Sequence, residues 1–211
     1  MSARFLDDQA RAAFDRAIRA IEGVSATEVV VALRRRSHEY RNANLIVGIV
    51  VAFAGLAAML FSRHPFGLVS ILVDPFTVGL AGGALVELLP AVKRLLTPPS
   101  RRHHHVQRAA RATFVERGVH ATTSRSGLLV YISWLEQQVS LVPDVALARA
   151  LPPDTLAHLE RDLTAAMPRG GAAVAALLEQ AAPELARAMP RRADDVNELP
   201  DALDSDLGRA R

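Results

Sequence analysis

The stretch from Asn44 to Ser62 reads NLIVGIVVAFAGLAAMLFS, and it decides how this chain is organised. None of its 19 residues is charged. At 1.5 Å per residue, a helix of this length measures about 28 Å. A helix of about that length crosses the hydrocarbon core of a bilayer. We therefore expect an integral membrane protein, with its first transmembrane helix at about residues 44–62.

A second apolar stretch follows from Phe66 to Val92, interrupted by Asp74 and Glu87. An aspartate followed by Pro75 has the pattern of an N-cap and a first helical position. This pattern predicts a second transmembrane helix at about residues 75–92, with the eight residues from 66 to 73 along the outer interface. The segment 43–97 is then a transmembrane hairpin.

Basic residues are distributed very unevenly around this hairpin. Only Arg63 lies in its connecting loop, whereas ten basic residues flank its two ends: Arg34, Arg35, Arg36, Arg41, Lys93, Arg94, Arg101, Arg102, Arg108 and Arg111. Because cytoplasmic flanks carry the excess of lysine and arginine, both termini are predicted to be cytoplasmic. The eight of these residues from Arg34 to Arg102 are candidates for contact with anionic lipid headgroups. The charged first 43 residues do not resemble a cleavable signal peptide.

Small residues recur at helical spacing in both spans. Gly48 and Ala52 lie in the first, and Gly79 and Gly83 in the second. Such residues let two helix backbones approach closely. The pattern fits packing within the hairpin, and it also fits a homodimer contact through Gly79 and Gly83.

The soluble flanks carry the signals of one α/β domain. An amphipathic helix and a β-branched run at 27–33 precede the hairpin, and the run has the pattern of a strand buried on both faces. After it come a helix at 101–118, strands at 127–134 and 138–142, and two more helices. A strand with two apolar faces cannot stand alone, so residues 1–42 are predicted to complete a sheet formed by residues 98–190. The acidic tail, residues 191–211, is predicted to be disordered.

Composition narrows the function classes. The 25 basic and 22 acidic residues nearly balance, which argues against a nucleic-acid-binding protein. With no cysteine, disulfides and thiolate catalysis are excluded. A single lysine among the basic residues and abundant alanine indicate a GC-rich bacterial genome, and hence the bacterial inner membrane.

Several segments together resemble the membrane-anchored bacterial branch of the TPM-domain family. They are Glu22, Thr27-Glu28-Val29 before a membrane hairpin, Phe114 to His120 with Thr122, GLLVYISWLEQQVSLV at 127–142, Asp144, and NELPDAL at 197–203. The resemblance implies a layered α/β domain whose relatives act as accessory factors of membrane complexes. Some relatives are described as phosphatases or as binding divalent cations. This chain has Ser140 where relatives commonly have a second acidic residue, and it lacks the glycine that usually follows shortly after the aspartate.

Three carboxylates combine this match with positions at predicted strand ends: Glu28, Glu136 and Asp144. Glu136 falls at the tip of the turn between the two predicted strands, where we expect its side chain to be presented to solvent. Oxygen ligands suit Ca²⁺ or Mg²⁺, with Glu136 and Asp144 as the candidate metal ligands. Turn and capping roles fit the same residues. We assign no catalytic residue, and we favour a binding or accessory module that docks on a membrane protein. A metal-assisted phosphatase is the alternative.

Overall fold

The computed structural model describes residues 5–37, 41–86, 89–152, 154–191, 197–199 and 203–207. The chain forms two compact units. One unit consists of residues 39–102, and the other joins residues 1–38 to residues 103–211. Residues 39–102 are thus an insertion into a single α/β domain.

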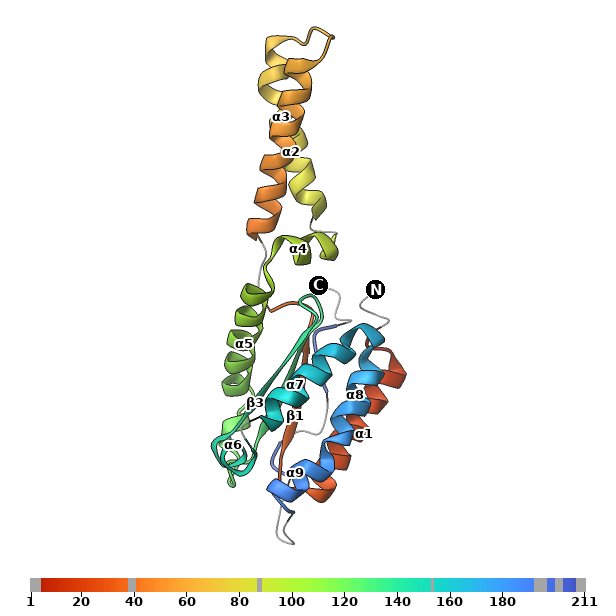
Figure 1. Cartoon of the computed structure of the whole chain (residues 1–211), viewed down its shortest axis with the longest axis vertical. Coiled ribbons are helices and arrows are strands. Elements are labelled where there is room, and N and C mark those ends of the chain that lie inside the picture. The colour runs from red at the N-terminus through yellow and green to blue at the C-terminus, as the bar shows by residue number, and fades with distance from the viewer. Residues whose placement is uncertain are drawn as a thin grey trace. The chain divides into compact units, whose positions relative to one another are not determined.

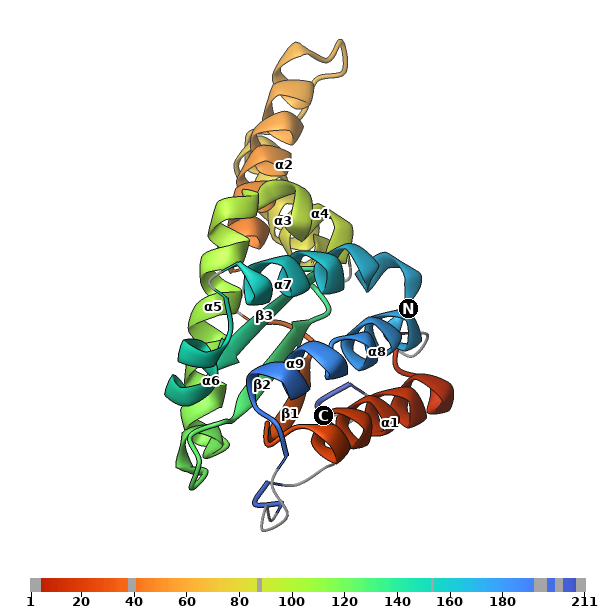
Figure 2. The same ribbon diagram turned by 60° about the horizontal axis from the view of Figure 1, so that its bottom comes forward.

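A mixed four-stranded sheet lies at the centre of the α/β unit, in the order β3-β2-β1-β4. Figure 2 shows β3, β2 and β1 of this sheet. β1 (Val29–Arg34) runs parallel to β2 (Leu128–Ser133) and to β4 (Asp204–Ser205). β2 and β3 (Gln138–Pro143) form an antiparallel hairpin. The strand ahead of the insertion therefore completes a sheet formed by residues beyond it, which confirms the expected composite α/β fold.

Helices cover both faces of this sheet (Figures 1 and 2). Alternate side chains of β1 and β2 pack on one face against α1 (Asp8–Val24), α7 (Thr155–Ala166), α8 (Gly171–Gln180) and α9 (Ala182–Ala188). On the other face, Val30 and Leu129 pack against Val106 and Ala110 of α5 (Pro99–Glu116). Because strand side chains alternate between faces, both faces of β1 and β2 have to be apolar.

Short elements complete the α/β unit. The 3₁₀ helix η2 (Val119–Ala121) follows α5, α6 (Val145–Ala150) follows β3, and η3 (Met167–Arg169) separates α7 from α8. α1 begins where the Asp7 side chain accepts a hydrogen bond from Ala10 N at 2.8 Å. Its buried face includes Phe14, Ile18 and Ile21, which lie three or four residues apart, as the sequence predicts.

The second unit contains two long apolar helices, α2 (Arg41–Phe61) and α3 (Leu68–Val86), followed by the short α4 (Pro90–Leu96). Asn44–Phe61 and Leu68–Val86 are long and apolar enough to cross a membrane. Their mean hydropathies are 2.4 and 1.7, and 0% and 17% of the residues in the two spans are buried. Buried core helices of water-soluble proteins hide most of their apolar side chains, and these helices do not.

The second long helix does not begin at Asp74 and Pro75 as predicted. It begins at Leu68 and ends at Val86, so Pro75 lies inside it, and Glu87 lies outside the described residues. An internal proline removes one main-chain hydrogen bond but does not stop the helix. Next to it, Thr77 Oγ1 donates a hydrogen bond to Asp74 O at 2.9 Å. The apolar run 68–73 is thereby part of this helix, ahead of its predicted start.

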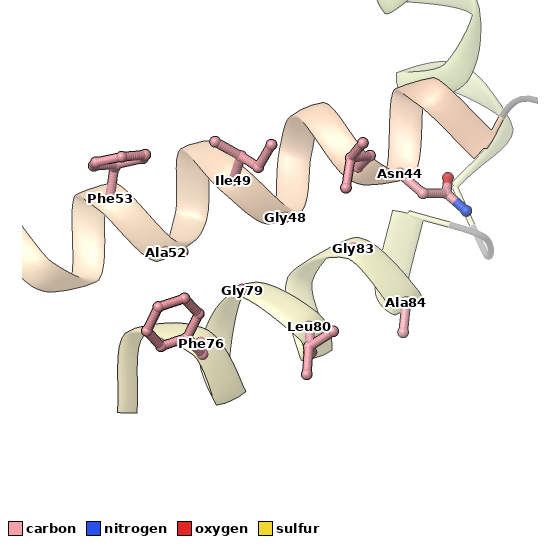
Figure 3. A pocket seen from close by; sticks show the side chains of 11 residues that line it. Asn44, Gly48, Ile49, Ala52, Phe53, Phe76, Gly79, Leu80, Gly83 and Ala84 are labelled. Carbon is pink, nitrogen blue, oxygen red and sulfur yellow. The ribbon is translucent and has the colours of Figure 1, made fainter. Parts of the chain in front are cut away.

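The small residues predicted at a helix contact lie on the seam between α2 and α3 (Figure 3). A Cβ added to Gly79 would lie 2.7 Å from Gly48 O and 2.8 Å from the Ala52 Cβ. A Cβ added to Gly83 would lie 2.9 Å from Asn44 O. This close approach is made within the hairpin, which accounts for the glycines without a second chain. A homodimer contact through Gly79 and Gly83 stays a prediction.

At residues 203–207 the C-terminal region is ordered against the α/β unit, although its composition predicts disorder; residues 192–196, 200–202 and 208–211 lie outside the described part of the chain. Among its described residues, Asp204 and Ser205 form β4, Leu207 is buried, and Leu203 packs against the same core. Composition misleads here because two leucines four residues apart are sufficient anchors. In addition, the neighbouring Asp204 forms ion pairs with Arg34 and Arg117.

Candidate functional site

The three predicted carboxylates do not come together. Leu128 N donates to Glu28 O at 2.7 Å, and Asp144 N donates to Gly127 O at 2.7 Å. Glu28 and Asp144 thus lie on either side of the strand that begins after Gly127, about 10 Å apart at two strand spacings. Glu136 follows the far end of β2, which at six residues is about 20 Å long. One cation cannot bind all three side chains.

Glu136 belongs to a buried network at the carboxyl ends of the parallel strands β1 and β2. One carboxylate oxygen accepts a hydrogen bond from Ser133 Oγ, and the other accepts from Ser37 N at 3.1 Å. Ser37 Oγ lies 2.8 Å from Ser133 Oγ and 3.3 Å from the Tyr131 hydroxyl, and its single proton can be donated to either of them. The network ties Ser37, which lies three residues beyond the end of β1, to the end of β2.

This geometry corrects the prediction that Glu136 is presented to solvent at the tip of a turn. Its side chain is 1% exposed. Gln137, the next residue, has a φ of 53°, a left-handed conformation that non-glycine residues seldom adopt. Within this turn the carboxylate lies against Ser133 and Ser37, which supply the hydrogen bonds that a buried carboxylate requires. Its role in the structure is to hold the end of the sheet.

The pKa of Tyr131 depends on its burial and on this buried carboxylate. Burial raises the pKa of Tyr131 above its ordinary value of 10.0, and the negative charge of Glu136 raises it further, while the Ser37 hydrogen bond lowers it. The ordinary value applies to the unfolded chain, so the folded state binds the phenolic proton more tightly. The resulting stabilisation is complete below pH 10 and is lost as the pH rises towards the raised pKa.

We therefore expect the free energy of unfolding to fall above about pH 10 as Tyr131 ionises in the unfolded chain. Tyr131→Phe removes this dependence, because phenylalanine has no proton to lose. Denaturant unfolding of both chains between about pH 8 and 11 measures the two slopes. Parallel slopes for the two chains would assign the alkaline loss to other groups.

Asp144 caps a helix. Its Oδ1 accepts a hydrogen bond from Val145 N at 2.7 Å, at the beginning of α6. Its other oxygen lies 3.9 Å from Arg125 Nε, at the limit of an ion pair. The side chain is buried. Of the two roles that the sequence left open for Asp144, capping is the one this geometry supports.

Glu28 lies beside a polar cavity of about 280 Å³ lined also by Arg19, Glu22 and Arg191. Its Oε2 accepts a hydrogen bond from Leu199 N at 3.3 Å. Across the same part of the domain, Glu198 accepts hydrogen bonds from Thr123 N at 2.9 and 3.2 Å. Glu28 therefore contacts the C-terminal region, as part of the surface on which residues 197–199 lie.

Within the described ranges, no group of three or more histidine, aspartate or glutamate residues is arranged to hold a metal ion. The proposed Ca²⁺ or Mg²⁺ ligands Glu136 and Asp144 lie at opposite ends of β2. The geometry thus gives no support to a shared site.

The eight basic residues predicted to contact lipid differ in how exposed they are. Arg34 is not available to headgroups, because it pairs with Asp204 of β4. Arg35, Arg36 and Arg101 are exposed, and Arg94 and Arg102 are half-buried. The side chains of Arg41 and Lys93 lie outside the described part of the structure.

Sequence reasoning missed the partners of the predicted carboxylates. Ser37 and Tyr131 carry no motif, and only the parallel pairing of β1 with β2 brings Ser37 to Ser133. Arg117 and Asp204, which form an ion pair, are 87 positions apart in the chain. The sequence signal that could have found this ion pair is the pair of aspartates two residues apart, Asp204 and Asp206, in a domain with many arginines.

No family model and no curated protein sequence matches the chain. Among solved structures, it is similar to the NMR structure of the BA42 protein from the psychrophilic bacterium Bizionia argentinensis. The TM-score is 0.57 at 15% sequence identity, over 95% of each chain. At this level of identity the likeness shows the fold alone, and it supports the mixed α/β architecture described above.

Proposed function

We propose that this chain is a membrane-anchored binding module of the bacterial cytoplasmic membrane. In this proposal α2 and α3 span the bilayer, and a TPM-like α/β domain lies in the cytoplasm, where it assists or regulates a membrane complex. The similarity to a solved structure supports the α/β fold of the proposed cytoplasmic domain.

The exposure of the hairpin carries this proposal. Large apolar side chains project from both helices, among them Phe53 at 68%, Leu68 at 86% and Leu80 at 77% exposure. Soluble monomers seldom expose contiguous apolar patches of more than a few hundred Å². A bilayer removes this cost, because its hydrocarbon core solvates apolar side chains.

Chain connectivity supports a hairpin with both ends on one side. Asn44 approaches Gly83 while Ala52 approaches Gly79, so α2 and α3 are antiparallel. β1 leads into α2, and α5 leads to β2, so both ends return to one sheet. One domain can form from these two flanks only if both lie on the same side of the membrane. The basic flanks make that side the cytoplasm.

No observation favours the metal-assisted phosphatase. That chemistry needs carboxylates converging on a cation within coordination distance, about 2.0 to 2.6 Å from each oxygen. Glu28, Glu136 and Asp144 are separated by the strands of the sheet.

The chain has no cysteine, so single-cysteine variants test this arrangement cleanly. We expect a membrane-impermeant maleimide to label His64→Cys in intact spheroplasts, and to label Arg149→Cys only after lysis. His64 lies between α2 and α3, and Arg149 is exposed on α6. Labelling of His64→Cys only after lysis would contradict the spanning hairpin.

The docking role has its own readout in the same cells. A photo-crosslinker attached at Arg149→Cys or at other exposed domain positions is expected to capture a protein of the membrane fraction. If crosslinks formed only from positions in the hairpin, the α/β domain would not be the part of the chain that binds the partner.

A further inference from the structure

The outer edge of the sheet is held by a short segment of the chain's own C-terminal region. β4 runs parallel to β1, with Asp204 opposite Ala32 and Ser205 opposite Leu33. Asp206 N donates to Leu33 O at 3.2 Å. In the described part of the tail this pairing covers two of the six residues of β1, so few main-chain hydrogen bonds fasten it.

Side chains supply most of the specificity. The Asp204 carboxylate forms ion pairs with Arg34 and Arg117, and Arg34 Nη1 also donates to Asp204 O at 3.1 Å. Arg34 ends β1, and Arg117 follows α5, so two distant elements converge on one carboxylate. Arginine pairs of this kind are strong and geometrically selective.

The next residues continue the pattern. Asp206 Oδ1 accepts a hydrogen bond from Arg35 N at 2.7 Å. Leu207 is buried in the main core, and its carbonyl accepts a hydrogen bond from Arg11 Nη2 at 3.5 Å. The edge thus recognises an extended segment with carboxylates two residues apart, followed directly by a leucine.

We propose that this edge of β1 is a peptide-binding site for an acidic extended segment of a partner protein, and that Asp204–Leu207 is its intramolecular competitor. This inference rests on the proposed function and names the partner's chemistry. Addition of a strand to a sheet edge is a recurrent mode of peptide recognition. The chain's own segment Asp204–Leu207 already shows which groups complement this edge, and it therefore indicates the sequence that a partner's segment needs.

Competition follows from tethering. A segment of the same chain binds at an effective concentration that can reach the millimolar range. A free peptide is therefore at a disadvantage, whereas a partner held in the same membrane is concentrated near the site. Weakening the chain's own segment should open the edge to an added peptide.

The experiment uses the full chain in detergent micelles and a fluorescent peptide with the sequence of residues 197–211. The receptors are the wild type and the variant Asp204→Asn/Asp206→Asn, whose own tail has lost both carboxylates. We expect the variant to bind the peptide at least about tenfold more tightly than the wild type, a difference of about 1.4 kcal/mol. A peptide with asparagine in place of Asp204 and Asp206 should not bind.

Matched receptor variants locate the site. Added to the double variant, Arg117→Gln should abolish peptide binding, whereas Arg111→Gln, an exposed residue of α5, should leave it unchanged. If the double variant does not fold, Asp206→Ala alone, which removes the side-chain acceptor of Arg35 N, replaces it with the same expected direction.

Two results would overturn the proposal. One is equal peptide binding by wild type and tail variant, or none by the variant. The other is a wild-type dimer that the tail variant converts to monomers, which would make a second copy's tail the occupant. Neither result touches the labelling of His64→Cys, so failure here is distinct from failure of the membrane-anchor proposal.

Discussion

Val30→Asp is expected to unfold the α/β unit, including residues that lie beyond the hairpin. Val30 is 6% exposed and packs with Leu129 and Tyr131 of β2 and Val106 of α5. A carboxylate at this position has no partner, and an unpaired buried charge costs about 4 kcal/mol or more. That is a large part of the stability of a typical domain, which is about 5 to 15 kcal/mol.

The measurement is limited proteolysis of residues 103–190 in the full chain, together with a thermal melt. Val115→Asp is the matched control, because Val115 is 62% exposed on α5. An exposed substitution there should cost no more than about 1 kcal/mol. If Val30→Asp left the later region as resistant as the wild type, the two flanks would fold independently, against the pairing of β1 with β2.

Glu136→Ala is expected to lower the melting temperature strongly. The substitution leaves the Ser133 hydroxyl and the Ser37 N–H without their acceptor in a buried site. Each buried polar group that loses its partner costs about 1 to 3 kcal/mol, so the sum is about 2 to 6 kcal/mol. Loss of stability is the sign that separates this structural role from the exposed binding role expected from sequence.

Glu179→Ala provides the comparison, since Glu179 forms a surface ion pair with Arg16 at 3.5 Å. Surface pairs contribute about 0 to 1 kcal/mol, so its melt should nearly match the wild type. Denaturant titration of both variants in the same detergent gives the free energies. An unchanged melt for Glu136→Ala would mean that the buried network contributes little, and would return Glu136 to the list of candidate binding residues.

The sequence by itself determined the organisation of this protein. The uninterrupted apolar stretch at 44–62 identified the first long helix. The run at 27–33, apolar on both faces, required a sheet completed by residues beyond the insertion. Both are local or near-local signals, because hydropathy and side-chain alternation follow from the period of a single element. The strands at β1, β2 and β3 were predicted to within two residues of their observed ends.

Only the tertiary structure decided which residues meet. Asp74-Pro75 resembles a helix start, yet the apolar residues on both sides form one helix, so local capping chemistry gave the wrong first residue. Glu136 looked exposed because a turn between strands usually is; Ser37, nearly a hundred positions earlier, makes it a buried anchor. Asp204 looked like part of a solvated tail until Arg34 and Arg117 were placed around it. Pairings of this kind depend on strand order and register, which no local pattern encodes, because the free energy that fixes them comes from packing between elements distant in the chain.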